Sequence, residues 1–204
     1  MRKIFFLLLA FCSSFSTSLA QEQKMRDVFA NMPDSILPLI SKNNRLDCID
    51  FIESKMPALV KNAVEESIEL TALTDDYLKL KMSNVSDAEM KLLKVNDTTR
   101  VICMVKTYAG PVKDSSIRFY TMDWRELDKK VAMPDVDAFV ADVPESEQNH
   151  RHNVVAMLRD MPFIMISLSP EDEQLTLSLQ TGELLKKDRE WVEPYLKVLK
   201  ISVK

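Results

Sequence analysis

Two histidines separated by one residue, His150 and His152, are the only imidazoles in this sequence, and imidazole can bind a metal ion or transfer a proton. The surrounding pattern predicts that they lie where a loop enters a helix, and residues two apart on a helix point in different directions. A zinc site also needs further Cys, His or carboxylate ligands, and none follows at a recognised spacing. We therefore expect no metal site and no cofactor, and we interpret the pair as solvated loop residues.

Carboxylates gather in two further places. The acidic residues of the stretch 134–147 are Asp135, Asp137, Asp142, Glu145 and Glu147. The stretch lacks the central glycine and spaced ligands of a calcium-binding EF-hand loop, so we interpret it as a flexible charged loop. Asp75 and Asp76 fall in a predicted turn, where water prevents the desolvation that paired catalytic carboxylates need.

No other pattern in the sequence points to catalysis. No serine or cysteine has a catalytic motif around it. The chain has only two glycines, Gly110 and Gly182, which excludes glycine-rich phosphate loops and a nucleophile elbow. We therefore assign no catalytic residue, and we favour a protein that is not an enzyme.

The composition is that of an ordinary globular protein, with 46% hydrophobic and 28% charged residues in a chain of 204. The formal net charge is −4, and it becomes more negative once Arg2 and Lys3 are removed. Because phosphate binding needs a basic face, this charge argues against nucleic acid as a partner.

The first twenty residues have the pattern of a secretory signal peptide. Arg2 and Lys3 precede an apolar run from Ile4 to Phe11, and small residues follow up to Ala20. The apolar run is too short to span a bilayer, so we predict cleavage after Ala20 and no transmembrane segment afterwards. The mature chain is expected in the periplasm or cell envelope, or outside the cell.

Three cysteines need separate interpretations. Cys12 is a poor match to a lipidation site, because Phe11 stands where a small residue is required. Cys48 lies in a helical pattern and Cys103 in an apolar strand pattern, where a thiol behaves as a small hydrophobic group. Their burial argues against a disulfide, although the sequence leaves their pairing open.

The periodicity of apolar residues predicts four helices and eight strands. Helical spacing covers residues 22–40, 44–57, 149–160 and 188–198, with Asn44 as the N-cap of the second helix. Pro33 is expected to break or restart the first of these helices. Alternation predicts strands at 68–72, 78–82, 90–95, 101–108, 117–121, 163–168, 175–179 and 201–203. The all-apolar 163–168 is expected to be a central strand, and 175–179 its solvent-facing partner.

This order predicts an α+β fold. We expect N-terminal helices, an antiparallel β-meander of about five strands, then a helix, a β-hairpin and a C-terminal helix, with the helices on one sheet face. Residues 21–204 are predicted to form a single domain, with a helical part at 21–60 and a sheet-containing part at 66–204.

Five segments of the chain carry a resemblance to a known family. They are Met25–Ser35, Asn43–Asp47, Leu73–Leu78, Leu168–Asp172 and Pro194–Leu196. They resemble a family of uncharacterised exported proteins from Bacteroidales, which is known only as a domain of unknown function. The resemblance covers most of the chain after Ala20. It implies an envelope or extracellular location in a gut or oral anaerobe, and it implies no activity, cofactor or catalytic residue.

The leading hypothesis is an exported, non-catalytic envelope protein that binds another protein or an apolar ligand. Alternation predicts that the open face of the sheet carries the partner surface, formed by Lys79, Lys81, Arg118 and Tyr120. The alternative is an exported hydrolase acting on glycan or peptide, with carboxylates drawn from distant loops. A structural subunit of an envelope assembly is a third possibility, and it predicts an exposed hydrophobic strip along an edge strand.

Overall fold

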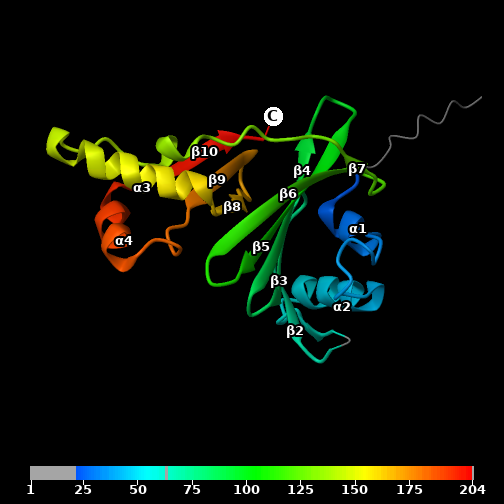
Figure 1. Ribbon diagram of the computed structural model, residues 1–204. Helices are drawn as coiled ribbons and strands as arrows, with labels where there is room; N and C mark the ends of the chain where they lie inside the picture. Colours follow the sequence, from blue (N-terminus) through cyan, green and yellow to red (C-terminus); the bar gives the residue numbers. More distant parts are fainter. Residues whose placement is uncertain (1–21, 63, 204) are drawn as a thin grey trace, which may run out of the picture.

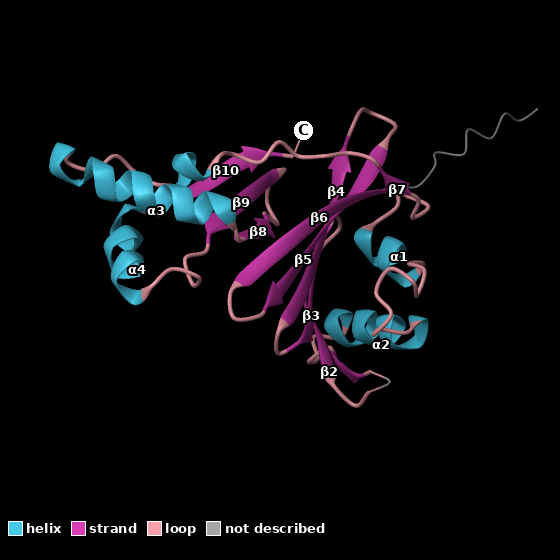
Figure 2. Cartoon of the chain, viewed as in Figure 1, coloured by secondary structure: helices cyan, strands magenta, loops and turns pink. Residues whose placement is uncertain are grey.

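A computed structural model describes residues 22–62 and 64–203. The predicted signal peptide 1–20, its cleavage site before Gln21, and Cys12 lie outside the described residues. The fold is α+β, as predicted: N-terminal helices are followed by an antiparallel sheet of seven strands, a helix, a smaller sheet of three strands and a C-terminal helix (Figures 1 and 2).

The N-terminal helices are α1 (Met25–Ala30) and α2 (Lys42–Glu53). The predicted interruption at Pro33 is present, since α1 ends at Ala30 and a proline has no N–H to continue the helical hydrogen bonds. The helix does not restart after it, and residues 34–40 form turns. Helix α2 begins with Ser41 as its N-cap, whose hydroxyl accepts a 3.3 Å hydrogen bond from the N–H of Asn44. Asn44, which the sequence pattern predicts to be the N-cap, lies inside the first turn.

The large sheet is a meander in which neighbouring strands follow one another in sequence and run antiparallel. Its strands are β1 (Leu59–Lys61), β2 (Ser67–Leu73), β3 (Tyr77–Ser83), β4 (Ser86–Lys94), β5 (Arg100–Ala109), β6 (Lys113–Thr121) and β7 (Glu126–Leu127). The five predicted strands correspond to β2–β6. The two edge strands have three and two residues, too few to show a period of two.

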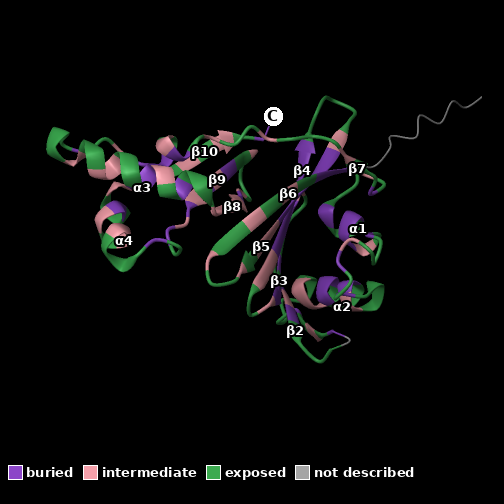
Figure 3. Ribbon diagram, in the orientation of Figure 1, coloured by how far each residue is buried: buried purple, intermediate pink, exposed green. Residues whose placement is uncertain are grey.

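Each face of this sheet carries its own hydrophobic core. Leu78, Leu80 and Met104 face α1 and α2, whereas Tyr77 and Cys103 face the opposite way into the second core. Figure 3 shows buried residues on the sides of α1 and α2 that lie toward the sheet, and exposed residues on their outer sides. The meander is therefore the central layer, and both of its faces are covered over part of their area.

An extended segment after β7 leads to the second layer, seen as the long loop along the top of Figure 1. This layer contains a 3-10 helix (Val136–Phe139), another (Glu145–Glu147), α3 (Gln148–Asp160), β8 (Ile164–Leu168), β9 (Gln174–Leu179), α4 (Lys186–Val192), a third 3-10 helix (Glu193–Tyr195) and β10 (Val198–Ser202). Helices α3 and α4 belong to the second core, so the helices divide between the two faces of the large sheet.

Two strand assignments made from the sequence are wrong. The strand order of the small sheet is β10-β9-β8, so β8 is an edge strand and β9 lies in the middle. The predicted alternation of β9 is present, with Leu175, Leu177 and Leu179 buried, but its polar face is half-buried and not open to solvent. Strand β8 is apolar because Ile166 and Leu168 are buried in the second core, and burial of side chains does not distinguish an edge strand from a central one.

The two described cysteines are free and lie in different cores. Burial raises the pKa of the Cys48 thiol to about 11 and that of Cys103 to about 12. The sheet separates the two side chains, so a disulfide between them would require rearrangement of the fold.

Within residues 22–62 and 64–203, no helix has the length and apolar character needed to cross a bilayer.

Candidate functional site

The four side chains predicted to share one open face lie on two opposite faces. Lys79 lies opposite Glu89, Glu89 opposite Val105, and Val105 opposite Ile117. Residues directly opposite each other share a face of the sheet, so Lys79 and Ile117 point the same way. Arg118 follows Ile117 and therefore points to the other face.

Tyr120 is not exposed as expected. Only 3% of it is accessible, and its ring lies 5.6 Å from the ring of Trp124 in the core beneath the N-terminal helices. Arg118 is exposed and pairs with Glu126 at 3.2 Å, while Lys79 and Lys81 are exposed on the opposite face. The expectation that these four side chains share one face of the sheet is wrong, because alternation within each strand does not specify how the faces of successive strands align across the turns. Whether these residues contact a partner stays a prediction.

An apolar groove lies instead at the end of the sheet where β3 turns into β4 and β5 ends. Its volume is about 110 Å³. The lining residues are Leu37, Pro38, Leu39, Met82, Ser86, Asp87, Ala88, Lys106 and Tyr108. Leu39 and Tyr108 are 42% and 56% exposed, so two large apolar side chains border the groove and remain open to solvent. We call this feature the sheet-end groove.

The loop that carries Leu37, Pro38 and Leu39 is held by a buried arginine. Arg45 of α2 is 1% exposed, and its guanidinium donates to the carbonyls of Met32 at 2.5 Å and Ile40 at 2.8 Å. The same group pairs with the Asp34 carboxylate at 2.8 Å. Planar guanidinium donors can hold several acceptors in a fixed geometry, so Arg45 fixes both ends of this loop.

A second cation holds the middle of the loop. The Lys106 ammonium on β5 donates to the carbonyl of Ile36 at 2.8 Å. Burial lowers the pKa of Lys106, and the nearby charge of Arg118 adds to that effect. The groove wall is thus anchored to both α2 and the sheet, which favours a preformed shape.

On the other face of the same sheet end lies a polar crevice of about 370 Å³, beside β8. It contains two carboxylates, Asp87 and Glu89, which are two residues apart on β4 and so share a face. Both oxygens of Glu89 are occupied: Oε1 pairs with Lys79 at 2.9 Å, and Oε2 accepts the N–H of Leu168 at 2.6 Å. Glu89 therefore joins the two layers, and it is not an unbound acid or base.

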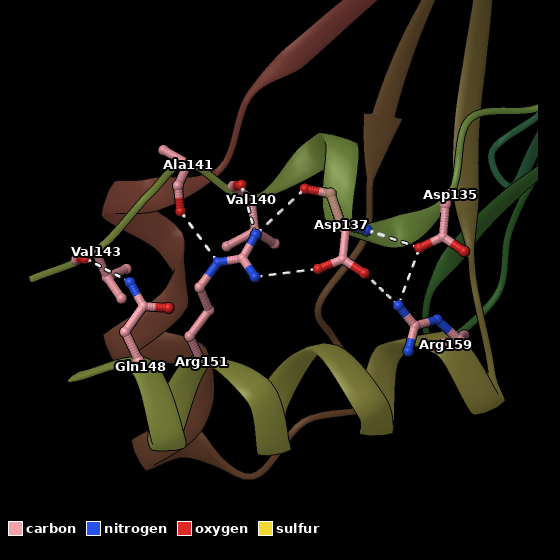
Figure 4. Close-up of polar contacts among 8 residues, drawn as sticks. All are labelled: Asp135, Asp137, Val140, Ala141, Val143, Gln148, Arg151 and Arg159. Carbon is pink, nitrogen blue, oxygen red and sulfur yellow. Dashed lines mark hydrogen bonds and ion pairs between the residues drawn. The ribbon is translucent and has the colours of Figure 1, made fainter. Parts of the chain in front are cut away.

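The acidic stretch 134–147 is not the flexible loop that we expected. Arg151 of α3 donates to Asp137 at 3.0 Å and to the carbonyl of Val140 at 3.2 Å (Figure 4). Arg159 pairs with Asp135 at 3.1 Å and also with Asp137. The backbone N–H of Asp137, followed by Arg159, holds the pKa of Asp135 below its usual value. These arginines bind the side chains of Asp135 and Asp137 to α3.

The histidines lie on α3, and His150 contacts α4. His150 Nε2 is 3.5 Å from Asp188, and its ring meets that of Trp191 edge-on at 4.4 Å. Trp191 in turn donates from Nε1 to Glu147 at 3.1 Å. Among the described residues, no group of three or more Cys, His, Asp or Glu side chains is arranged to hold a metal ion. The expectation of solvated loop residues is wrong, because both histidines lie within α3 and His150 packs between α3 and α4.

The sequence contained only a weak signal for the sheet-end groove. Leu39 belongs to an apolar run around Pro38, and Tyr108 ends an apolar strand, so both patterns predict burial. Their exposure depends on where the loop after α1 crosses the sheet, which the spacing of residues does not specify.

Comparisons with known proteins give a fold relative and a family. A structure described as a domain of an uncharacterized protein from Porphyromonas gingivalis W83 is similar, with a TM-score of 0.71 and 22% sequence identity. The match covers 88% of this chain and 93% of that one, and at this identity it shows the fold alone. No curated protein matched the chain. Residues 17–202 match the family model described as "Protein of unknown function (DUF3256)", and the chain therefore belongs to that family.

Proposed function

We propose that this protein is an exported, non-catalytic module of the cell envelope that binds another protein through the sheet-end groove. The observation that carries the proposal is a small apolar groove bordered by Leu39 and Tyr108, both exposed by about two fifths or more. Aromatic side chains such as tyrosine are enriched among the residues that contribute most to binding at the centre of protein interfaces. Export, to the periplasm, the envelope or the exterior, is supported by the pattern of residues 1–20 alone.

The size of the groove favours a protein partner over a free apolar ligand. Sites for small molecules usually measure about 300–1,000 Å³, whereas an apolar cavity of about 150 Å³ holds one benzene ring. At about 110 Å³, the sheet-end groove has room for a single apolar side chain. A partner chain would insert one such residue and bury Leu39 and Tyr108 around it.

The hydrolase alternative is supported by one feature, the pair Asp87 and Glu89 in the polar crevice. A glycosidase needs two carboxylates about 5–10 Å apart, one of which acts as an acid or nucleophile. Glu89 is bonded to Lys79 and to the Leu168 N–H, so catalysis by this residue would break a contact between the two layers. This geometry favours binding over hydrolysis.

An assembly subunit built on an apolar edge strand has less support. The edge strands β1 and β7 have three and two residues. Strand β10 is longer, but exposed Val198 is followed two residues later by exposed Lys200 on the same side. A lysine on an edge strand disfavours pairing with another chain.

The test is capture of partners from envelope extract with the tagged mature protein, its Leu39→Ser/Tyr108→Ser variant, and a Leu185→Ser/Val198→Ser control. The control removes two exposed apolar side chains that do not line the groove, since Leu185 precedes α4 and Val198 lies on β10. We expect a stoichiometric partner that the wild type and the control retain and the groove variant loses. Equal retention by all three proteins would contradict the proposed site.

A parallel assay addresses the alternative. The wild type and an Asp87→Asn variant are incubated with a panel of glycans and peptides. The proposal predicts no turnover by either protein. Turnover that Asp87→Asn abolishes would establish the hydrolase and overturn the proposed function.

A further inference from the structure

A second cavity beside β8 has a volume of about 430 Å³. It is bounded by the start of β6, the segment before the first 3-10 helix, the end of α3 and strand β8. The apolar residues of its wall are Met133, Pro134, Val136, Pro162, Ile164 and Ile166. This volume falls within the range of about 300–1,000 Å³ that is usual for small-molecule sites, and mainly apolar walls are typical of them.

The polar residues that line this cavity are Asp114, Ser115, Asp135 and Arg159. Arg159 also contacts Asp137, which lies just outside the lining. Arg151 also pairs with Asp137 at 3.0 Å, so two guanidinium groups face two carboxylates, and Asp114 adds a third carboxylate. The positive charge of Arg159 is already balanced, so the surroundings of the cavity carry a net negative charge.

Asp114 is the carboxylate with the weakest partner. Its one hydrogen bond seen in the structure is a long one, 3.3 Å from the N–H of Ile164 at the start of β8. Bonds of this length are weaker than the usual 2.9–3.0 Å. Asp114 is exposed and lies beside Ile164, so a cationic group could pair with it while an attached hydrocarbon chain lies on the apolar wall.

We propose that this cavity binds a small amphipathic cation, a primary amine on a hydrocarbon chain. The ammonium group pairs with Asp114, and the chain packs against Met133, Ile164 and Ile166. A carboxylate of the same length is disfavoured because Asp135 and Asp137 already neutralise Arg159. The site is separate from the sheet-end groove, and binding here does not depend on the proposed function.

The test compares three probes of equal chain length by isothermal titration calorimetry: octylamine, 1-octanol and octanoate. The two charged probes are kept below their micelle concentrations and 1-octanol below its solubility limit. We expect saturable binding of octylamine, weaker binding of octanol and the weakest binding of octanoate. An exposed charge pair contributes roughly a fivefold difference in affinity, so Asp114→Asn should weaken octylamine binding by about that factor and leave octanol unchanged. Asparagine keeps an oxygen that can accept the N–H of Ile164, so the fold should be preserved.

A second pair of variants tests the apolar wall. Met133 and Met157 are 40% and 45% exposed, and only Met133 lines the cavity. Met133→Ser should weaken the binding of both octylamine and octanol, while Met157→Ser on α3 should leave both affinities unchanged. Absence of saturable octylamine binding, equal affinity for octanoate, or indifference to both Asp114→Asn and Met133→Ser would overturn the proposal.

Discussion

Glu89 on β4 accepts a 2.6 Å hydrogen bond from the backbone N–H of Leu168 on β8, a residue 79 positions later in the chain. Two further side chains of the large sheet act in the same way, since Ser115 accepts the N–H of Ile166 at 3.0 Å and Asp114 that of Ile164 at 3.3 Å. The donors of the free edge of β8 are thus satisfied by side chains instead of by another strand. This arrangement covers an edge that would otherwise pair with foreign chains.

Removal of the Glu89 carboxylate should weaken the contact between the layers. Glu89→Ala leaves the Leu168 N–H without its acceptor, and an unsatisfied buried donor costs about 1–3 kcal/mol. Glu89→Gln keeps an acceptor and loses only the ion pair with Lys79, so its cost should be smaller. Urea unfolding measures the free energy of unfolding of both variants. An equal decrease in the two would contradict the role of the Leu168 hydrogen bond.

The buried thiols report where Glu89→Ala loosens the fold. Burial raises the pKa of both cysteines, so in the native protein they should react with a thiol reagent only after opening. Cys103 belongs to the core under the second layer and Cys48 to the core under α1 and α2. We expect Glu89→Ala to speed labelling of Cys103 more than that of Cys48, as followed by mass spectrometry. Equal acceleration at both would mean that the layers open together.

Loss of Arg45 should destabilise the loop that forms the groove wall. Arg45→Met leaves the carbonyls of Met32 and Ile40 without a donor, at about 1–3 kcal/mol for each buried group. The matched control is Arg26→Met, because Arg26 makes an exposed ion pair with Glu53, and such pairs contribute about 0–1 kcal/mol. Denaturant unfolding measures both. Similar decreases in the free energy of unfolding for the two variants would show that Arg45 does not hold the loop.

The charge of Asp135 should stabilise the protein at neutral pH and cease to do so in acid. Its pKa is lowered by the N–H of Asp137 and then by Arg159. A lowered pKa stabilises the folded state above the unfolded value of about 3.9, and this contribution is lost as the pH falls through the folded pKa. Asp135→Asn keeps a capping oxygen and removes the charge. Its denaturation midpoint should lie below that of the wild type at neutral pH.

The difference between wild type and Asp135→Asn should shrink as the pH falls below about 4. The control is Glu183→Gln, which removes an exposed carboxylate for which the described part of the chain shows no ion pair. The urea denaturation midpoints of the three proteins, measured from neutral pH to below about 4, test this prediction. A difference that is constant with pH would contradict stabilisation by the Asp135 charge.

The fold class was predictable because long amphipathic strands carry a clear period. Residues 68–82 alternate between apolar and polar side chains, and the structure places β2 and β3 there. The short edge strands β1 and β7 gave no such signal. The position of β8 in its sheet was mispredicted. A run of apolar residues indicates that a strand is buried, but it does not indicate whether the strand's edge pairs with another strand or is covered by side chains.

The sites were less predictable than the fold. Lys79 and Arg118 lie on opposite faces because the turns between their strands set how the faces align, and local alternation does not specify this. Arg151 and Arg159 of α3 bind Asp137 and Asp135, which precede the helix, and helical spacing does not predict contacts outside the helix. The exposure of Leu39 and Tyr108 depends likewise on long-range packing.

The most direct test of the binding proposal places a photo-crosslinking amino acid at position 108 in living cells, with position 198 as the control. Both side chains are well exposed, at 56% and 62%, and lie on different sheets. The account predicts one specific crosslinked protein from position 108 that is absent from position 198 and disappears when Leu39→Glu is added. The same product from both positions, or none from position 108, would contradict a protein-binding role for the sheet-end groove.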